Sequence, residues 1–128
     1  MNNNTDNTQQ IEQFIKDVHK GLGYGRREKV YQHALHYLLN RAGIQSSMEV
    51  PFNIQFNGWC VGTSYVDIKM DTCLIEIKYV KKITDIHIAQ LHAYMRDWDS
   101  DGILINYASN PIQIKHYKLS RLLSNTNN

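Results

Sequence analysis

The segment YVDIKMDTCLIEIKYV, residues 65–80, is the part of the sequence that most constrains the fold. Apolar and polar residues alternate on both sides of a short polar interruption, which predicts two β-strands joined as a hairpin. The first strand carries Asp67, and the second carries Glu76 and Lys78. The chain must therefore build a β-sheet that accommodates these charged side chains among Val, Ile and Leu.

The rest of the chain shows both helical and strand-like periodicity. Helical spacing of apolar residues covers residues 9–19, 26–41 and 84–98, with Thr84 as a candidate N-cap. Strand-like patterns cover residues 50–56, 59–70, 73–80, 102–108 and 112–119. Asn57-Gly58 between the first two of these is a strong hairpin signal. We therefore expect one α/β domain with a central mixed β-sheet flanked by helices.

Length and composition limit the remaining choices. The chain has 128 residues, the size of one ordinary domain, and 42% of them are hydrophobic. We expect residues 9–121 to form this domain and the Asn- and Thr-rich residues 1–8 and 122–128 to be disordered tails. No apolar run approaches the roughly 18–20 residues that span a bilayer, so no membrane contact is expected.

Net charge and cysteine content say little about the function of the chain. The formal net charge of +2 is compatible with a nucleic-acid partner but carries almost no weight alone. The two cysteines have no C-x-x-C spacing, and the N-terminus has no secretory signal. We therefore expect reduced thiols and an intracellular location, either cytoplasmic or with the chromosome.

The register of the hairpin decides how its acids are placed. If residues 71–72 form the turn, Lys69 faces Leu74 and Asp67 faces Glu76. Directly opposed residues have Cβ atoms about 4.5–5.5 Å apart, so the two carboxylates repel each other unless a cation lies between them. Mg²⁺, or Mn²⁺ in its place, prefers oxygen ligands and binds one or two carboxylates in many sites. The spacing therefore predicts a metal site.

Period-two alternation places Lys78 on the same face as Glu76, beside the predicted metal. Its ammonium group could steady an attacking hydroxide or neutralise charge on a phosphate. The alternative is a solvent-facing hairpin in which Asp67, Glu76, Lys69 and Lys78 form cross-strand salt bridges. The segment by itself leaves both interpretations open.

Two helices carry further candidates. Glu28 lies three residues before Tyr31, on or beside the apolar stripe of its helix, so it is either a third acid or a residue at the rim. His87, Gln90 and Tyr94 share one helix face, where they could grip phosphate or orient a carboxylate. A plain polar face with a buried tyrosine is the alternative.

Taken together, these residues resemble a known pattern. The elements are VHKGLGYGRREKVY (residues 18–31), Asp67, Glu76-Ile77-Lys78, HIAQLHAY (residues 87–94) and GILINYA (residues 102–108). In this order they are similar to the GxxExxY family, a compact branch of the PD-(D/E)XK nuclease superfamily. The similarity runs from about residue 18 to about residue 117. It implies the superfamily's restriction-endonuclease-like core, a mixed sheet flanked by helices.

The resemblance also implies roles. Asp67 and Glu76 would be metal ligands, Glu28 would complete the metal site directly or through water, and Lys78 would be the catalytic lysine. Gly25, Glu28 and Tyr31 match the G-x-x-E-x-x-Y signature. A further set would support the site or contact nucleic acid: His87, Gln90 and Tyr94 on one helix, with Tyr31, Arg26 and Arg27. Ser64-Tyr65-Val66 occupies the place of an arginine that the family often has before the strand acid.

The expected function is therefore metal-dependent hydrolysis of phosphodiester bonds, with DNA as the expected substrate and Mg²⁺ as the cofactor. The alternatives are a catalytically silent nucleic-acid-binding or complex-assembly module of the same fold, and a structural protein with surface charges. A homodimer or a larger protein partner is compatible with so small a domain.

Overall fold

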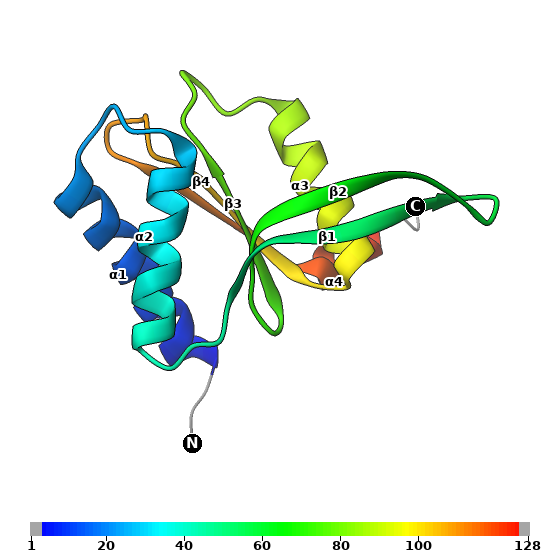
Figure 1. Ribbon diagram of the computed structural model, residues 1–128, viewed down its shortest axis with the longest axis horizontal. Coiled ribbons are helices and arrows are strands. Elements are labelled where there is room, and N and C mark those ends of the chain that lie inside the picture. The colour runs from blue at the N-terminus through cyan, green and yellow to red at the C-terminus, as the bar shows by residue number, and fades with distance from the viewer. Residues whose placement is uncertain (1–3, 126–128) are drawn as a thin grey trace.

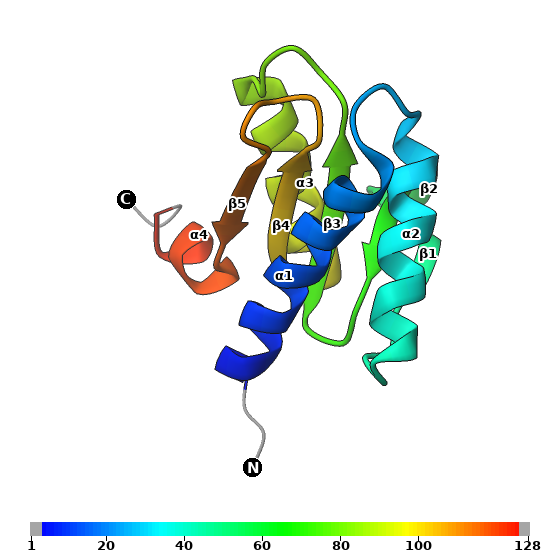
Figure 2. The same ribbon diagram turned by 90° about the vertical axis from the view of Figure 1, so that its left-hand side faces the viewer.

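A computed structural model describes residues 4–125, and it consists of one mixed sheet with helices on both faces (Figures 1 and 2). In chain order the elements are α1 (Asn4–Leu22), α2 (Glu28–Arg41), β1 (Ser47–Phe56), β2 (Trp59–Lys69), β3 (Cys73–Lys78), α3 (Asp85–Trp98), β4 (Asp101–Asn106), β5 (Gln113–Tyr117) and α4 (Leu119–Asn125). This is the expected α/β architecture.

The sheet order follows the chain, β1-β2-β3-β4-β5. Only the pairing of β3 with β4 is parallel, and α3 makes the crossover between these two strands. The other pairs are antiparallel. β1 and β5 are therefore the two edges of the sheet.

Two hydrophobic clusters lie on opposite faces of the sheet. Ile75 and Ile77 of β3 join residues of α1 and α2, including Ile15 and Leu35. Leu74, which alternates with them, packs with α3 on the other face. β3 and β4 are buried over almost their whole length, as expected for strands covered on both faces.

α3 has the N-terminal cap that the sequence suggested. The Thr84 hydroxyl accepts a hydrogen bond from the backbone N–H of His87, and His87 Nδ1 accepts one from the Thr84 N–H at 3.0 Å. The reciprocal bonds are those of a capping box, with histidine in the place usually taken by Glu or Gln. The helix is thereby anchored just after the end of β3.

The two ends of the chain differ from expectation. α1 begins at Asn4 and α4 reaches Asn125, so residues 4–8 and 122–125 are helical although we expected tails there. Residues 1–3 and 126–128 of those tails lie outside the described residues. The start of α1 carries no apolar stripe that would mark it. Buried residues further on, Ile11 and Ile15, anchor the helix, and extending an anchored helix is easier than nucleating it.

Candidate active site

The candidate site lies where β2 and β3 separate. β3 pairs with β4 along all six residues, but it pairs with β2 only at Ile68–Ile75 and Lys69–Leu74. The pairing of Lys69 with Leu74 confirms the expected register. The next pair in that register is Asp67 and Glu76. Here β2 leaves the sheet together with β1 as a long projecting hairpin (Figure 1).

Asp67 and Glu76 interlock at this separation. Asp67 Oδ2 accepts a hydrogen bond from the backbone N–H of Ile77 at 2.7 Å, and Glu76 Oε2 accepts one from the N–H of Asp67 at 3.3 Å. Glu76 is only 5% exposed. Burial raises the pKa of the Glu76 carboxyl to about 9, and the neighbouring Asp67 charge acts in the same direction. Burial also raises the pKa of Asp67, against the opposing effect of its bond from Ile77.

The salt-bridge interpretation of the hairpin does not describe this arrangement. The lysine ion pairs of the described residues, Lys29–Glu49 and Lys118–Asp101, involve neither acid of the site. Lys69 instead donates to backbone carbonyls at the turn. The two carboxylates are therefore held together at a partly dry position without a lysine in contact.

Lys78 lies on the same side of the sheet as Glu76 and meets α3. Its Nζ donates a hydrogen bond to Gln90 Oε1 at 3.4 Å, and its charge lowers the pKa of both Asp67 and Glu76. Gln90 is also hydrogen-bonded to Tyr94, whose pKa is raised by burial and then by the charges of the two acids. The structure thus brings Gln90 and Tyr94 to the site, as the shared helix face predicted.

The residues of the G-x-x-E-x-x-Y signature converge on Tyr79, the residue after Lys78. The backbone N–H of Gly25, at φ +91°, donates to Tyr79 Oη at 2.6 Å. Glu28 Oε2 accepts a hydrogen bond from the Tyr79 N–H at 2.9 Å. The Tyr31 ring is fully buried and stacks on Tyr79 with ring centroids 5.8 Å apart. The signature therefore docks α2 and its preceding loop onto the end of β3.

Glu28 is close enough to Asp67 for its charge to act on that carboxyl, but its own carboxylate already accepts a hydrogen bond. Its charge contributes to the raised pKa of Asp67, while its Oε2 accepts the Tyr79 N–H. Its place at the first turn of α2 also suits a negative charge, because the helix N-terminus carries partial positive charge. A role as a third ligand remains a proposal.

The other predicted residues lie around the rim or support it. Tyr31 accepts a hydrogen bond from the Arg26 backbone N–H and donates one to the Gly23 carbonyl, so it orders the loop before α2. Arg26 and Arg27 are exposed in that loop. The His87 side chain belongs to the cap of α3, which is the role the structure assigns to it.

Two residues that the sequence did not single out tie α2 to β2. Gln32, only 3% exposed, donates from Nε2 to the Asp67 carbonyl at 3.1 Å and to Glu49 Oε2 at 3.5 Å. Glu49 lies opposite Asp67 between the pairs Met48–Ile68 and Val50–Val66, in the left-handed conformation with φ 52°. Gln32 follows Glu28 by one helical turn, a spacing that could have indicated it.

Asn106 of β4 fixes the backbone that follows β3. It pairs with Lys78 across the parallel strands and is buried. Its Oδ1 accepts from the Val80 N–H at 3.1 Å, and its Nδ2 donates to the Val80 carbonyl at 2.9 Å. A lone Asn in the otherwise apolar run GILIN is the sequence signal that marks it, because a buried amide needs partners.

The donor set at the separation suits a hard divalent cation. Asp67 and Glu76 offer only oxygen atoms, which Mg²⁺ and Mn²⁺ prefer. Their mutual repulsion and raised pKa values are what a bound cation would relieve. Among the described residues no group of three or more His, Cys, Asp or Glu is arranged to hold a metal, so such an ion would complete its shell with water or phosphate oxygens.

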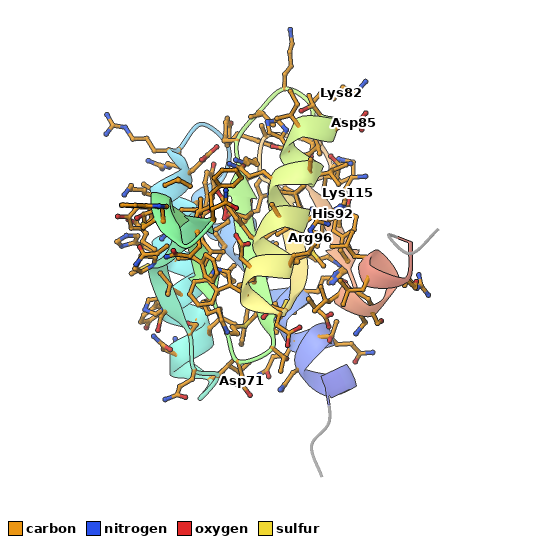
Figure 3. The ribbon with its side chains drawn as sticks, turned by 90° about the vertical axis from the view of Figure 1, so that its right-hand side faces the viewer. Asp71, Lys82, Asp85, His92, Arg96 and Lys115 are labelled. Atoms are coloured by element: carbon orange, nitrogen blue, oxygen red, sulfur yellow. The ribbon has the colours of Figure 1, made fainter. Side chains whose placement is uncertain are left out.

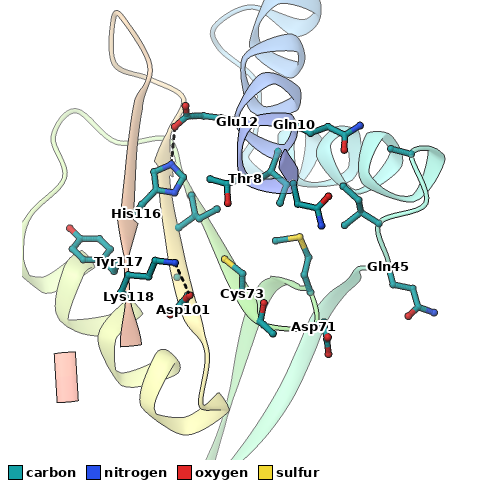
Figure 4. A pocket seen from close by; sticks show the side chains of 18 of the residues that line it. Thr8, Gln10, Glu12, Gln45, Asp71, Cys73, Asp101, His116, Tyr117 and Lys118 are labelled. Carbon is teal, nitrogen blue, oxygen red and sulfur yellow. Dashed lines mark hydrogen bonds and ion pairs between the residues drawn. The ribbon is translucent and has the colours of Figure 1, made fainter. Parts of the chain in front are cut away.

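A cavity of about 720 Å³ lies at the other end of the sheet and is not part of this site (Figure 4). It is lined by the beginnings of β3 and β4, including Cys73 and Asp101, whereas Lys78 ends β3. Burial raises the pKa of the Cys73 thiol to about 12, so it is not an available nucleophile. Figure 3 shows the same separation of ends, with Asp71 at one end of the molecule and Lys82 at the other.

Comparison with known proteins assigns the chain to a superfamily. A family model of the PD-(D/E)XK nuclease superfamily matches residues 5–118. This chain therefore belongs to the PD-(D/E)XK nuclease superfamily. Nucleases of this superfamily generally use divalent metal ions, and their substrates are nucleic acids.

No significant match was found among curated proteins or solved structures. None of the helices in residues 4–125 has the length and apolar content that crossing a bilayer would need.

Proposed function

We propose that this protein is a nuclease of the GxxExxY branch that hydrolyses phosphodiester bonds of DNA with Mg²⁺, or Mn²⁺ in its place. One observation carries the proposal: two interlocked acids at the β2–β3 separation, with a lysine on the same face as Glu76. An intracellular location near the chromosome would suit this substrate.

Asp67 and Glu76 would hold the ion, with Glu28 adding a contact through water. When bound, the ion would polarise the scissile phosphate and lower the pKa of a water molecule. The burial of Glu76 supports this role, because charges interact more strongly where water is excluded.

Lys78 would stabilise negative charge at the reacting phosphate by donating from its Nζ. Gln90 accepts one hydrogen bond from that Nζ and leaves the other two protons available. The helix face with Gln90 and Tyr94 would thus orient the lysine rather than react itself. Such an electrostatic contribution is worth about 10²–10³ in rate in comparable sites.

Arg26 and Arg27 would contact the phosphate backbone from the loop before α2. Both are exposed, and neither forms an ion pair among the described residues. Phosphate contacts of this kind position a nucleic acid but carry no sequence information.

The test is to incubate the purified protein with supercoiled DNA, linear DNA or RNA in Mg²⁺, Mn²⁺ or EDTA. We expect cleavage of DNA with either ion and none with EDTA. Lys78→Ala should lower the rate by at least about 100-fold. Metal binding, measured by calorimetry, should be unchanged in this variant.

Lys16→Ala is the matched control, because Lys16 is exposed on α1 away from the acids. It should cleave like the parent protein. A protein that binds DNA equally with and without metal and never cleaves it would instead be the catalytically silent module. Cleavage of RNA but not of DNA would replace DNA as the proposed substrate and would leave the proposed metal site unchanged.

A further inference from the structure

The distal half of the β1–β2 hairpin projects from the domain without cover. Every residue from 53 to 61 is exposed, so neither helix layer reaches this part of either strand. Figure 1 shows the hairpin extending past α3 and α4. Asn57 and Gly58 make the turn with φ 52° and 83°, the left-handed values of a type I′ hairpin. The arm is therefore a paired hairpin and not an irregular loop, with one register shift between Ile54 and Gln55 that leaves Val61 unpaired.

On one face of this arm, β1 contributes an apolar side chain at every second position from base to tip. Phe52, Ile54 and Phe56 alternate along β1 and so share a face, and Trp59 is the cross-strand partner of Phe56. At the base, Phe52 packs edge-on against Trp98 of α3, with ring centroids 5.3 Å apart. At the tip, Phe56 is 65% exposed and Trp59 is 76% exposed. The strip thus continues the α3 side of the core out into solvent.

The arm carries no charge. Residues 50–66, VPFNIQFNGWCVGTSYV, contain no Asp, Glu, Lys, Arg or His, although the chain has 26 Lys, Arg, Asp and Glu residues elsewhere. An arm that followed a nucleic-acid backbone would need cations against the phosphates. Exposed edge strands usually carry charges that prevent association, and this one does not. Both facts favour a protein partner over a nucleic acid.

We propose that the partner is a second copy of this chain, with the apolar faces of two hairpin arms packed against each other about a two-fold axis. A two-fold interface sets a surface against itself, so an uncharged strip meets no like charge. A different protein that recognised this arm specifically would be expected to present complementary charges, but the arm has no charged residue for them to pair with.

The available area fits a modest dimer. An aromatic side chain buries roughly 150–250 Å² when fully covered, so Phe56 and Trp59 at their exposures offer roughly 300 Å² per copy. With Ile54, 39% exposed, and the arm backbone, the total for two copies approaches about 1,000 Å², the lower limit for a specific interface. An interface at this limit belongs to the weak, transient class, so we expect a dimer that dissociates on dilution. This inference goes beyond the proposed function and does not depend on it.

Analytical ultracentrifugation tests the proposal on the full chain from about 1 to about 200 µM. We expect a monomer–dimer equilibrium. Trp59→Ser should weaken it by roughly tenfold or more, since aromatic anchors dominate such interfaces. Tyr37→Ser removes another exposed aromatic residue, 60% exposed on α2, and should leave the equilibrium unchanged. Circular dichroism should show both variants folded.

The exposed thiol of Cys60, next to Trp59, offers a second measurement. Cys60 pairs with Gln55, so its side chain lies on the face opposite Phe56 and Trp59 and can carry a dye without blocking the interface. Copies labelled with a donor dye at Cys60 should show energy transfer to copies labelled with an acceptor dye, and Trp59→Ser should abolish it. A monomer at all concentrations would overturn the proposal, as would a dimer that Trp59→Ser leaves intact. If the parent is monomeric at all concentrations and Trp59→Ser loses DNA binding, the arm is assigned to nucleic acid instead.

Discussion

The pair of carboxylates of Asp67 and Glu76 is costly for folding when no cation is bound. The two carboxylates interlock through hydrogen bonds from the backbone N–H groups of Ile77 and Asp67, which holds them close together. Without a cation, burial raises the pKa of both carboxyls, and the Asp67 charge raises the pKa of Glu76 further. The residue pair is thus more stable with one proton or one cation than with two free charges.

Asp67→Asn tests this balance. The asparagine Oδ1 can still accept from the Ile77 N–H, and the repulsion with Glu76 disappears. We expect the free energy of unfolding of the metal-free variant to equal that of the parent or to be higher by up to about 1 kcal/mol. Its Mn²⁺ affinity, measured by calorimetry, should fall at least about 100-fold, since even residues that only support a ligand cost 10–100-fold.

Asp71→Asn provides the comparison, because Asp71 is an exposed acid in the turn of the same hairpin. It should leave Mn²⁺ affinity unchanged. Equal Mn²⁺ affinity in Asp67→Asn and the parent would remove Asp67 from the site.

At the scale of elements, α2 is the part that joins the two strands of the site. Glu28 reaches the end of β3, and Gln32, one turn later, reaches the Asp67 carbonyl of β2. The helix therefore spans the place where the strands separate. This explains why a motif on a helix accompanies acids on strands.

Gln32→Leu tests whether Gln32 positions Asp67 for metal binding. The change leaves the Asp67 carbonyl without its partner, and we expect a loss of about 1–3 kcal/mol in the free energy of unfolding. Because Asp67 would be held less firmly, Mn²⁺ affinity should fall about 10–100-fold in protein that is still folded. Gln45→Leu, at an exposed position in the loop after α2, should change neither quantity. Unchanged metal affinity in folded Gln32→Leu would limit Gln32 to packing.

Tyr79→Phe tests the anchor of the loop before α2. It removes the oxygen that accepts the Gly25 N–H while keeping the stacking on Tyr31. We expect a loss of about 0.5–1.5 kcal/mol and faster hydrogen exchange of the Gly25 amide, followed by NMR. Tyr37→Phe, on the exposed face of α2, serves as the control. An unchanged Gly25 exchange rate would show that this hydrogen bond does not order the loop.

For the whole molecule, the raised pKa of Glu76 makes stability depend on pH. Its ordinary pKa is 4.5 and its folded value is about 9, so between these values the folded state holds a proton that the unfolded state has released. The free energy of unfolding must then fall as pH rises through this range. The stabilisation that comes from the proton on Glu76 is fully present only below the ordinary pKa of 4.5.

Thermal melts of the metal-free protein from about pH 5 to about pH 9 should show a falling midpoint, and Glu76→Gln should flatten this slope. Saturating Mg²⁺ should raise the midpoint of the parent most at the upper end, where the carboxylate is ionised. A slope that is identical in Glu76→Gln would assign the pH dependence to other groups.

The elements and the register could be read from the sequence because they rest on local rules. Period-two alternation, the Asn57-Gly58 turn and the Thr84 cap each depend on a few neighbouring residues, and the even turn at residues 71–72 set Asp67 opposite Glu76. The superfamily and its mixed sheet followed from motifs of the same local kind.

Tertiary structure alone decided what lies between those elements. The bonds of Gln32 to Asp67 and of Gly25 to Tyr79 join residues 35 and 54 positions apart, and no periodicity records such contacts. The same holds for the burial of Glu76 and for the bare hairpin arm. A side chain's environment is set by which surfaces meet in space, and this depends on the packing of helices on the sheet rather than on the order of neighbours in the chain.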